Sequence, residues 1–155
     1  MKTLMLNHDN IEMLIQLEQD ARVSEPDIFV EDFDVHRFRE ETNMALTNPT
    51  FSSARCMMCV NDEGLAVGRI DFAIVPSFSF GGNVQVYVDW VYVLKEHRHR
   101  GVAQFLFAQM EEYIKAMGID EYFLLMAENS EAQSFYRSIE RAKIAHYDVL
   151  KKHIV

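Results

Sequence analysis

Residues 98–103, Arg-His-Arg-Gly-Val-Ala, lie between a run rich in β-branched and aromatic residues (84–93) and an amphipathic stretch (102–117). This order predicts a strand, a tight basic turn and the start of a helix. A helix N-terminus presents unpaired backbone N–H groups and the positive end of the helix dipole, so such a turn beside two arginines forms an anion site. Gly101 allows turn geometry and leaves no Cβ between the amides and the ligand. The expected ligand is a phosphate or pyrophosphate.

The turn matches neither of two common phosphate-binding motifs, since it lacks the Gly-Lys-Ser/Thr ending of a Walker motif and the three glycines of a dinucleotide motif. It resembles instead the acetyl-CoA signature of the GNAT acetyltransferase superfamily, Gln/Arg-x-x-Gly-x-Gly/Ala, which is met by Arg98, Gly101 and Ala103. Residues 129–136, Asn-Ser-Glu-Ala-Gln-Ser-Phe-Tyr, are similar to the Asn-x-x-Ala-x-x-Phe-Tyr segment of that family. The two motifs stand in the family's order and separation, which favours membership.

Length and composition indicate one α/β domain over residues 1–155, because 49% hydrophobic residues suffice for one core. The formal net charge of -9 argues against a nucleic-acid partner and suits a cationic acceptor. Within this acidic background, residues 95–100 concentrate positive charge, as a local phosphate site requires. No apolar run is long enough to span a bilayer or to form a signal peptide at residues 1–9, so a cytoplasmic location without membrane contact is expected.

Cys56 and Cys59 form a Cys-x-x-Cys spacing within a predicted strand. An odd separation on a strand directs the two side chains to opposite faces, and no second ligand pair lies nearby in the sequence. We therefore expect two ordinary thiols, with no metal site and no disulfide.

The elements that must position the turn are predicted from periodicity and from turn residues. We expect a first strand at 2–6, a helix capped by Asn7 or Asp9, one or two short helices within 31–47, strands at 51–61, 65–76 and 84–93, a helix at 102–117, a strand at 122–127, a short helix to 138 and a last strand at 142–149. The resemblance implies a GNAT α/β (α+β) fold, with a mixed, mostly antiparallel sheet of about six to seven strands flanked by about four helices.

The resemblance also implies a set of cofactor-binding residues for acetyl-CoA as the acetyl donor. The amides of the turn, which comprises Arg98, His99, Arg100, Gly101, Val102 and Ala103, are expected to bind the pyrophosphate. Backbone groups of Val91, Tyr92 and Val93 are expected to pair with the pantetheine arm as an added strand would, and Asn129 to donate to that arm. Asn129 also has a purely structural interpretation as a helix cap.

Two further residues match catalytic roles. Tyr136 corresponds to the family's general-acid tyrosine, which protonates the leaving thiolate, and its alternative interpretation is a packing residue on a helix face. Asp89 is the first candidate for the base that takes a proton from the ammonium of the acceptor, and its alternative is an exposed acid that attracts the cation. Glu128 and His97 are weaker candidates for the base.

The acceptor is predicted to be a small cationic amine. An aminoglycoside is one candidate, and polyamines, amino acids or a peptide N-terminus satisfy the same electrostatics. Residues 87–98 and 146–149 are similar to the smaller GNAT-type aminoglycoside 3-N-acetyltransferases, and Glu128 and Asp148 would bind the substrate. A protein or peptide N-acetyltransferase and a CoA-sensing module without turnover are the alternatives. The chain departs from the family pattern after Tyr136, where the usual glycine is missing. Either the terminal sheet is abbreviated or a partner subunit completes the acceptor wall, and the resemblance implies a homodimer.

Overall fold

The computed structural model of the chain describes residues 1–78, 81–126, 129–146 and 148–154. These residues group into two compact units, 1–124 and 125–155, and each is described by itself. The single domain expected over residues 1–155 stays a prediction. Of the described helices, none is both long and apolar enough to cross a bilayer.

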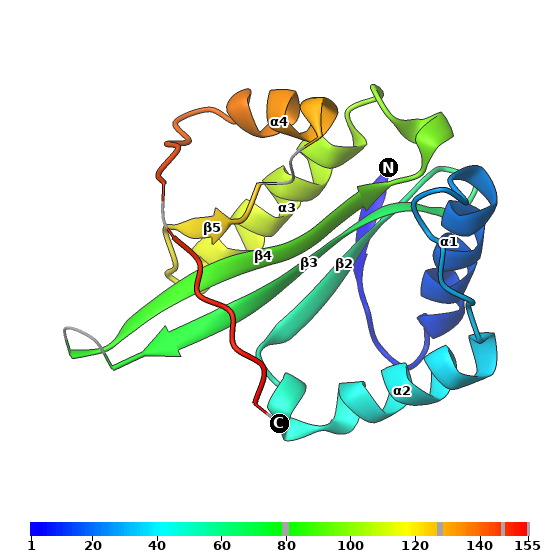
Figure 1. Cartoon of the computed structure of the whole chain (residues 1–155), viewed down its shortest axis with the longest axis horizontal. Coiled ribbons are helices and arrows are strands. Elements are labelled where there is room, and N and C mark those ends of the chain that lie inside the picture. Colours follow the sequence, from blue (N-terminus) through cyan, green and yellow to red (C-terminus); the bar gives the residue numbers. More distant parts are fainter. Residues whose placement is uncertain (79–80, 127–128, 147, 155) are drawn as a thin grey trace. The chain divides into compact units, whose positions relative to one another are not determined.

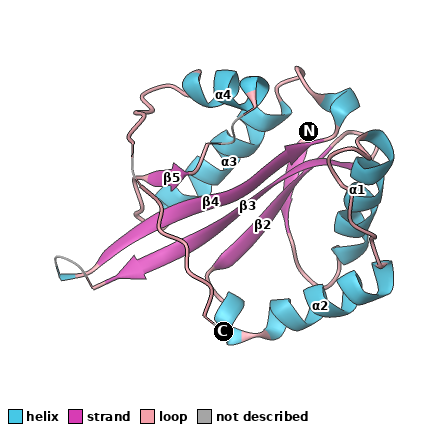
Figure 2. Cartoon of the chain, viewed as in Figure 1, coloured by secondary structure: helices cyan, strands magenta, loops and turns pink. Residues whose placement is uncertain are grey.

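The first unit is a mixed sheet with helices (Figures 1 and 2). Its elements are β1 (Lys2–Met5), α1 (Ile11–Ser24), α2 (Val35–Thr47), η1 (Pro49–Phe51), β2 (Ala54–Val60), β3 (Ala66–Ser77), β4 (Asn83–Val93), η3 (Lys95–His97), α3 (Val102–Ala116) and β5 (Tyr122–Leu124). The strand order is β1-β2-β3-β4-β5, and only the β4–β5 pair is parallel. The predicted α/β fold class is confirmed, but the described residues form five strands, fewer than the six to seven expected.

Apolar side chains pack on both faces of this sheet. On one face, Leu14, Leu17 and Ala21 of α1 pack with Met58 of β2, which is fully buried. On the other face α3 contacts β2, β3 and β4, and the ring centroids of Phe72 and Tyr113 lie 5.9 Å apart. Because each fully buried large apolar side chain contributes about 1.5–3 kcal/mol, these layers fix the positions of the strands from both sides.

The second unit contains one helix, α4 (Ser130–Arg137), within its described residues. The predicted strand at 142–149 is wrong, since 142–146 and 148–149 have no strand structure. An apolar and β-branched pattern makes a strand only where another strand satisfies its backbone groups, and the described part of this unit contains no second strand. Sequence periodicity carries no information about whether such a partner is present.

The carboxyl end of β4 and the start of α3 approach β3 closely at Gly68. A Cβ at this position would lie 2.9 Å from the backbone oxygen of Tyr92, 3.1 Å from Cγ1 of Val102 and 3.3 Å from Cγ2 of Val93. A backbone oxygen held in a sheet cannot move aside as the end of a flexible side chain can. Glycine at this position therefore permits the close approach of the three elements.

A second contact ties the end of α1 to the end of β4. Both carboxylate oxygens of Glu25 accept hydrogen bonds from Arg98, at 3.0 and 2.5 Å, and one accepts from the Tyr92 hydroxyl at 2.8 Å. Nε of Arg98 donates to the carbonyl of Val93 at 3.0 Å. Burial raises the pKa of Glu25, but the hydrogen bonds from Arg98 and Tyr92 outweigh burial and hold it below its ordinary value of 4.5.

We predict that Gly68→Ala lowers the free energy of unfolding by about 1–3 kcal/mol, as overpacking does, and speeds amide hydrogen exchange at Phe105, whose N–H donates to the carbonyl of Gly101. Urea denaturation and exchange measured by NMR check the two effects. Gly64→Ala is the control, because a Cβ at Gly64 meets nothing within 4 Å and only its positive φ of 87° is strained. Unchanged stability and exchange in Gly68→Ala would contradict the packing argument.

A second prediction concerns pH. Because the pKa of Glu25 is lower in the folded chain than its ordinary value of 4.5, this carboxylate stabilises the fold above pH 4.5, and the contribution is lost as the pH falls below 4.5. Glu25→Gln should lower stability at pH 7 by about 1.5–3 kcal/mol and flatten the acid limb of a stability–pH curve. Glu63→Gln, in the exposed β2–β3 turn, should retain the acid limb of the parent protein.

Candidate acetyl-donor site

The basic turn folds as the sequence predicts, with Gly101 as the N-cap of α3. Backbone φ is positive at His99 (56°) and at Gly101 (80°), so two left-handed residues separated by one position curve the chain. The first bond between the cap and the helix runs from the N–H of Phe105 to the carbonyl of Gly101 at 2.9 Å, and no side chain caps this end in the described part of the chain. The first-turn amides, at Val102 and Ala103, are therefore placed to donate to an anion.

The two arginines of the turn lie in different surroundings. The guanidinium of Arg98 is held by Glu25, and the backbone N–H of Arg98 donates to the carbonyl of Lys95 at 3.3 Å. Arg100 and His99 are exposed. The positive potential of the turn therefore comes from the helix end and from the exposed side chains, while Arg98 is committed to the connection with α1. The expected contacts of these residues with pyrophosphate stay predictions.

On one of its two edges, β4 is paired with β5 along only part of its length. β5 pairs with Val86, Tyr87 and Val88, and the pairing ends there, whereas β4 continues to Val93. On its other side β4 remains paired with β3 up to Val93, which lies opposite Gly68. Among the described residues, no strand therefore pairs with the β5-facing edge of residues 89–93. That edge includes the three residues expected to pair with a pantetheine arm.

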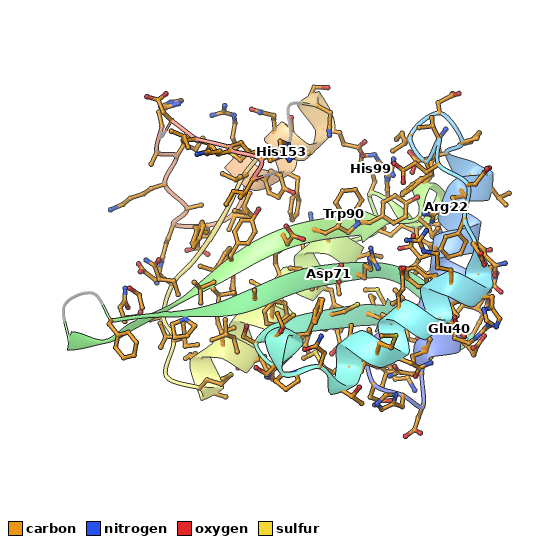
Figure 3. The ribbon with its side chains drawn as sticks, turned by 60° about the horizontal axis from the view of Figure 1, so that its bottom comes forward. Arg22, Glu40, Asp71, Trp90, His99 and His153 are labelled. Carbon is orange, nitrogen blue, oxygen red and sulfur yellow. The ribbon has the colours of Figure 1, made fainter. Side chains whose placement is uncertain are left out.

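A β-bulge lies where β4 leaves β5. Asp71 of β3 pairs with Trp90, and Phe72 pairs with Val88, so Asp89 is the extra residue. Bulges bend a strand and redirect its side chains, and they often lie next to active sites. The bulge leaves Asp89 exposed and Trp90 42% exposed; Trp90 is labelled in Figure 3.

The bulge also influences a neighbouring tyrosine. Burial, together with the charge and hydrogen bonding of Asp89, raises the pKa of Tyr87. Asp89 and Tyr87 therefore interact at the bulge, and the Tyr87 phenol stays protonated at neutral pH. Residues two positions apart share a face of a regular strand, so the sequence spacing is compatible with this contact.

In the second unit, Asn129 caps α4 and its side chain accepts from the N–H of Ala132 at 2.8 Å. The structural alternative for Asn129 is thus confirmed, and its contact with the cofactor stays a prediction. Tyr136 lies on α4, where burial raises the pKa of its phenol, so the hydroxyl stays protonated at neutral pH. Asp148 is exposed, and Glu128 lies outside the described residues.

Sequence reasoning missed two carboxylates. Glu25 lies beside a predicted helix end and carries no motif, yet it holds Arg98. Asp71 is an acid inside the alternating strand predicted at 65–76, the same anomaly that singled out Asp89. Applying that criterion to every predicted strand would have found it.

The two cysteines project to opposite faces as expected, since Cys56 packs against the α1 cluster and Cys59, three positions on, is buried. Both are free thiols, and burial raises the pKa of each. In the described ranges, no group of three or more His, Cys, Asp or Glu residues is arranged to hold a metal ion.

Comparison with solved structures agrees with this architecture. A probable acetyltransferase superposes with a TM-score of 0.79 at 16% identity, covering 100% of this chain and 99% of the other. Aminoglycoside 6'-N-acetyltransferase from Acinetobacter haemolyticus gives 0.71 at 18% identity, with 100% of each chain covered. Ribosomal-protein-alanine N-acetyltransferase from Brucella melitensis gives 0.71 at 18% identity, covering 97% and 98%. The first of the two named enzymes is a 6'-N-acetyltransferase, whereas the sequence resembles 3-N-acetyltransferases.

A search of curated proteins finds no match to the sequence. The model of the acetyltransferase (GNAT) family matches residues 12–139, which include both motifs, the β4 bulge and the turn before α3. Members of this family generally use acetyl-CoA. With most of its length matched, the chain belongs to the GNAT family of acetyltransferases and is an N-acetyltransferase by that membership.

Proposed function

We propose that the protein transfers the acetyl group of acetyl-CoA to the primary amine of a small cationic acceptor. The observation that carries this proposal is the strand-free edge of β4 at residues 89–93, which leads through η3 into the amide-rich turn at 98–103. An extended chain with amide groups can pair along such an edge, and a diphosphate can be bound by the turn. The two sites follow one another in the chain, as the two parts of coenzyme A do.

The residues of the first unit supply the binding functions. Backbone groups of Val91, Tyr92 and Val93 form hydrogen bonds with the pantetheine arm, and the amides from Arg98 to Ala103 bind the pyrophosphate. Acetyl-CoA, when bound, supplies an acetyl group activated as a thioester. The space beside Gly101 is open in the described part of the chain, since a Cβ at this position would meet nothing within 4 Å.

Asp89 takes the proton from the ammonium of the acceptor. Its exposure at the bulge of β4 allows it to reach an acceptor directly or through a water molecule. His97, half-buried in η3, and Glu128 are the alternative bases. Tyr136 keeps its proton at neutral pH because burial raises its pKa, and it donates that proton to the departing sulfur. Asn129 donates to the cofactor arm while capping α4.

The charge of -9 favours a cationic acceptor, with Glu128 and Asp148 as further binding groups. An aminoglycoside is one candidate, supported by the similarity to an aminoglycoside 6'-N-acetyltransferase. A protein N-terminus is the second candidate, supported by the similarity to a ribosomal-protein-alanine N-acetyltransferase. A homodimer in the cytoplasm remains the expected form of the protein.

For the donor site, we predict that Gly101→Val weakens coenzyme A binding about tenfold, measured by calorimetry. A β-branched residue disfavours the φ of 80° at this position, so the turn must rearrange before its amides can converge. Gly64→Val provides a matched control, because it introduces the same kind of strain at a φ of 87° in the β2–β3 turn. Equal losses in both variants, or none in either, would argue against the turn as the pyrophosphate site.

For the chemistry, we predict that Tyr136→Phe lowers kcat about 10²-fold or more and leaves the Kd for coenzyme A unchanged, as loss of a general acid does. Thiol release from acetyl-CoA in the presence of a panel of amines and peptides measures the rate. Tyr122→Phe, which removes a hydroxyl that donates to Glu111, should retain full activity. A CoA-sensing module would release no thiol with any amine.

A further inference from the structure

A pocket of about 450 Å³ lies in the first unit, where α2 and η1 meet the strands. This volume is within the range of small-molecule sites, near its lower end. Six of the eleven lining residues are apolar, namely Met5, Leu6, Ala45, Leu46, Phe51 and Ala54. Its wall on the sheet side is formed by Cys56 of β2 and Asp71 of β3. Asp71 is the one carboxylate among these lining residues, and a carboxylate beside apolar side chains requires a partner.

The hydrogen-bonding capacity of Asp71 is not filled. Its Oδ1 is buried and has no hydrogen-bond partner among the described residues. Its Oδ2 lies 3.4 Å from Nε of Arg69, which itself lacks hydrogen-bond geometry to any acceptor there. The side chain as a whole is 25% exposed and lines the pocket, whereas Oδ1 itself is buried. Buried polar groups are nearly always satisfied, and an exception of this kind in a pocket points to a ligand.

The neighbouring charges leave Asp71 able to accept a cation. Arg69 is shared, because its terminal nitrogen lies 3.0 Å from Glu18, and Glu18 also pairs with Arg22. Asp89 adds a third carboxylate within electrostatic range of Asp71. With Arg55, which also lines the pocket, three guanidinium groups and three carboxylates lie in this region, and Asp71 is the carboxylate in the pocket lining.

Two other polar side chains that line the pocket, Arg55 and Cys56, differ in their relation to Asp71. Nε of Arg55 donates to the Tyr113 hydroxyl on α3 at 3.0 Å, and one of its terminal nitrogens donates to the carbonyls of Ser52 and Ala54. These hydrogen bonds hold the guanidinium of Arg55 toward the face of the sheet that α3 covers. Burial raises the pKa of the Cys56 thiol well above its usual value, so the thiol stays neutral and donates only a weak hydrogen bond to Asp71, without balancing the charge of the carboxylate.

The pocket wall adjoins the proposed reaction centre. Asp71 is paired with Trp90, the residue after the bulge at Asp89, and adjacent strands lie about 4.8 Å apart. Figure 3 labels Asp71 on β3 and Trp90 on the neighbouring β4. A ligand at Asp71 is therefore one strand away from the edge of β4 that we assign to the acetyl donor.

We infer that Asp71 binds an ammonium group of the acceptor, and that the pocket selects an amine carried on a hydrocarbon skeleton over one carried on a polyhydroxylated ring. This inference rests on the proposed function and narrows its acceptor class. Hydroxyl groups placed against Leu6, Leu46 and Phe51 would lose their water without gaining partners, whereas methylene groups would be stabilised there.

The test uses the full chain and hexylammonium chloride as the probe, with binding followed by NMR titration at pH 7. We expect Asp71→Asn to weaken binding at least tenfold, because a charge-assisted contact is lost. Asp120→Asn, at an exposed position, should bind as the parent protein does. The neutral analogue 1-hexanol should bind at least tenfold more weakly than hexylammonium. Equal binding by Asp71→Asn, or no binding by the parent protein, overturns the inference.

A second variant keeps the test decisive if Asp71→Asn fails to fold. Ala45→Phe fills the pocket from α2 without removing a charge, and it should abolish hexylammonium binding while leaving coenzyme A affinity unchanged. Binding that persists in Ala45→Phe overturns the pocket as the site.

Calorimetry with coenzyme A and thiol release with hexylamine separate this inference from the proposed function. If hexylammonium binds through Asp71 but coenzyme A does not bind, the proposed function fails and the cation site stands. If amines are acetylated equally well by the parent protein and Asp71→Asn, the proposed function stands and the cation site fails.

Discussion

The parting of β4 from β5 after Val88 is the constraint on which the donor site depends. A strand inside a sheet normally satisfies its backbone groups on both sides, whereas residues 90–93 pair with β3 on one side and with no strand of the described chain on the other. The unsatisfied edge needs another partner, and in water it is stabilised by solvent or by an extended ligand. The bulge at Asp89 accompanies the parting, because the extra residue bends β4 where its pairing with β5 ends.

Contacts with β3, α3 and α1 hold the carboxyl end of β4 in position. The register with β3 continues to Gly68, where the absence of a Cβ lets β4 and α3 approach. Arg98 ties the carbonyl of Val93 to Glu25 at the end of α1. These contacts define the direction of the chain as it enters the turn, so the amides at the start of α3 converge without help from a ligand.

Some charged side chains of the first unit hold the fold together, and others are available to bind a ligand. Arg98 and Arg69 are engaged with buried carboxylates on the α1 side, which leaves the backbone of the turn as the principal anion-binding element. Asp71, by contrast, keeps an unpartnered oxygen at a cost in stability, since burial raises its pKa despite the charge of Arg69. A carboxylate retained under those conditions is more readily explained by binding than by folding.

The sequence by itself determined the elements whose periodicity is strong and local: α3, β2, β3, β4 and the turn at 98–103 lie within a few residues of their predicted bounds. It also determined the family, because two motifs with fixed spacing are a property of the chain alone. Tertiary structure decided that 142–149 lacks a strand, that Arg98 pairs with Glu25, 73 positions earlier, and that Asp71 faces a pocket. Each of these depends on a partner distant in the sequence, and periodicity reports only which side of an element is apolar.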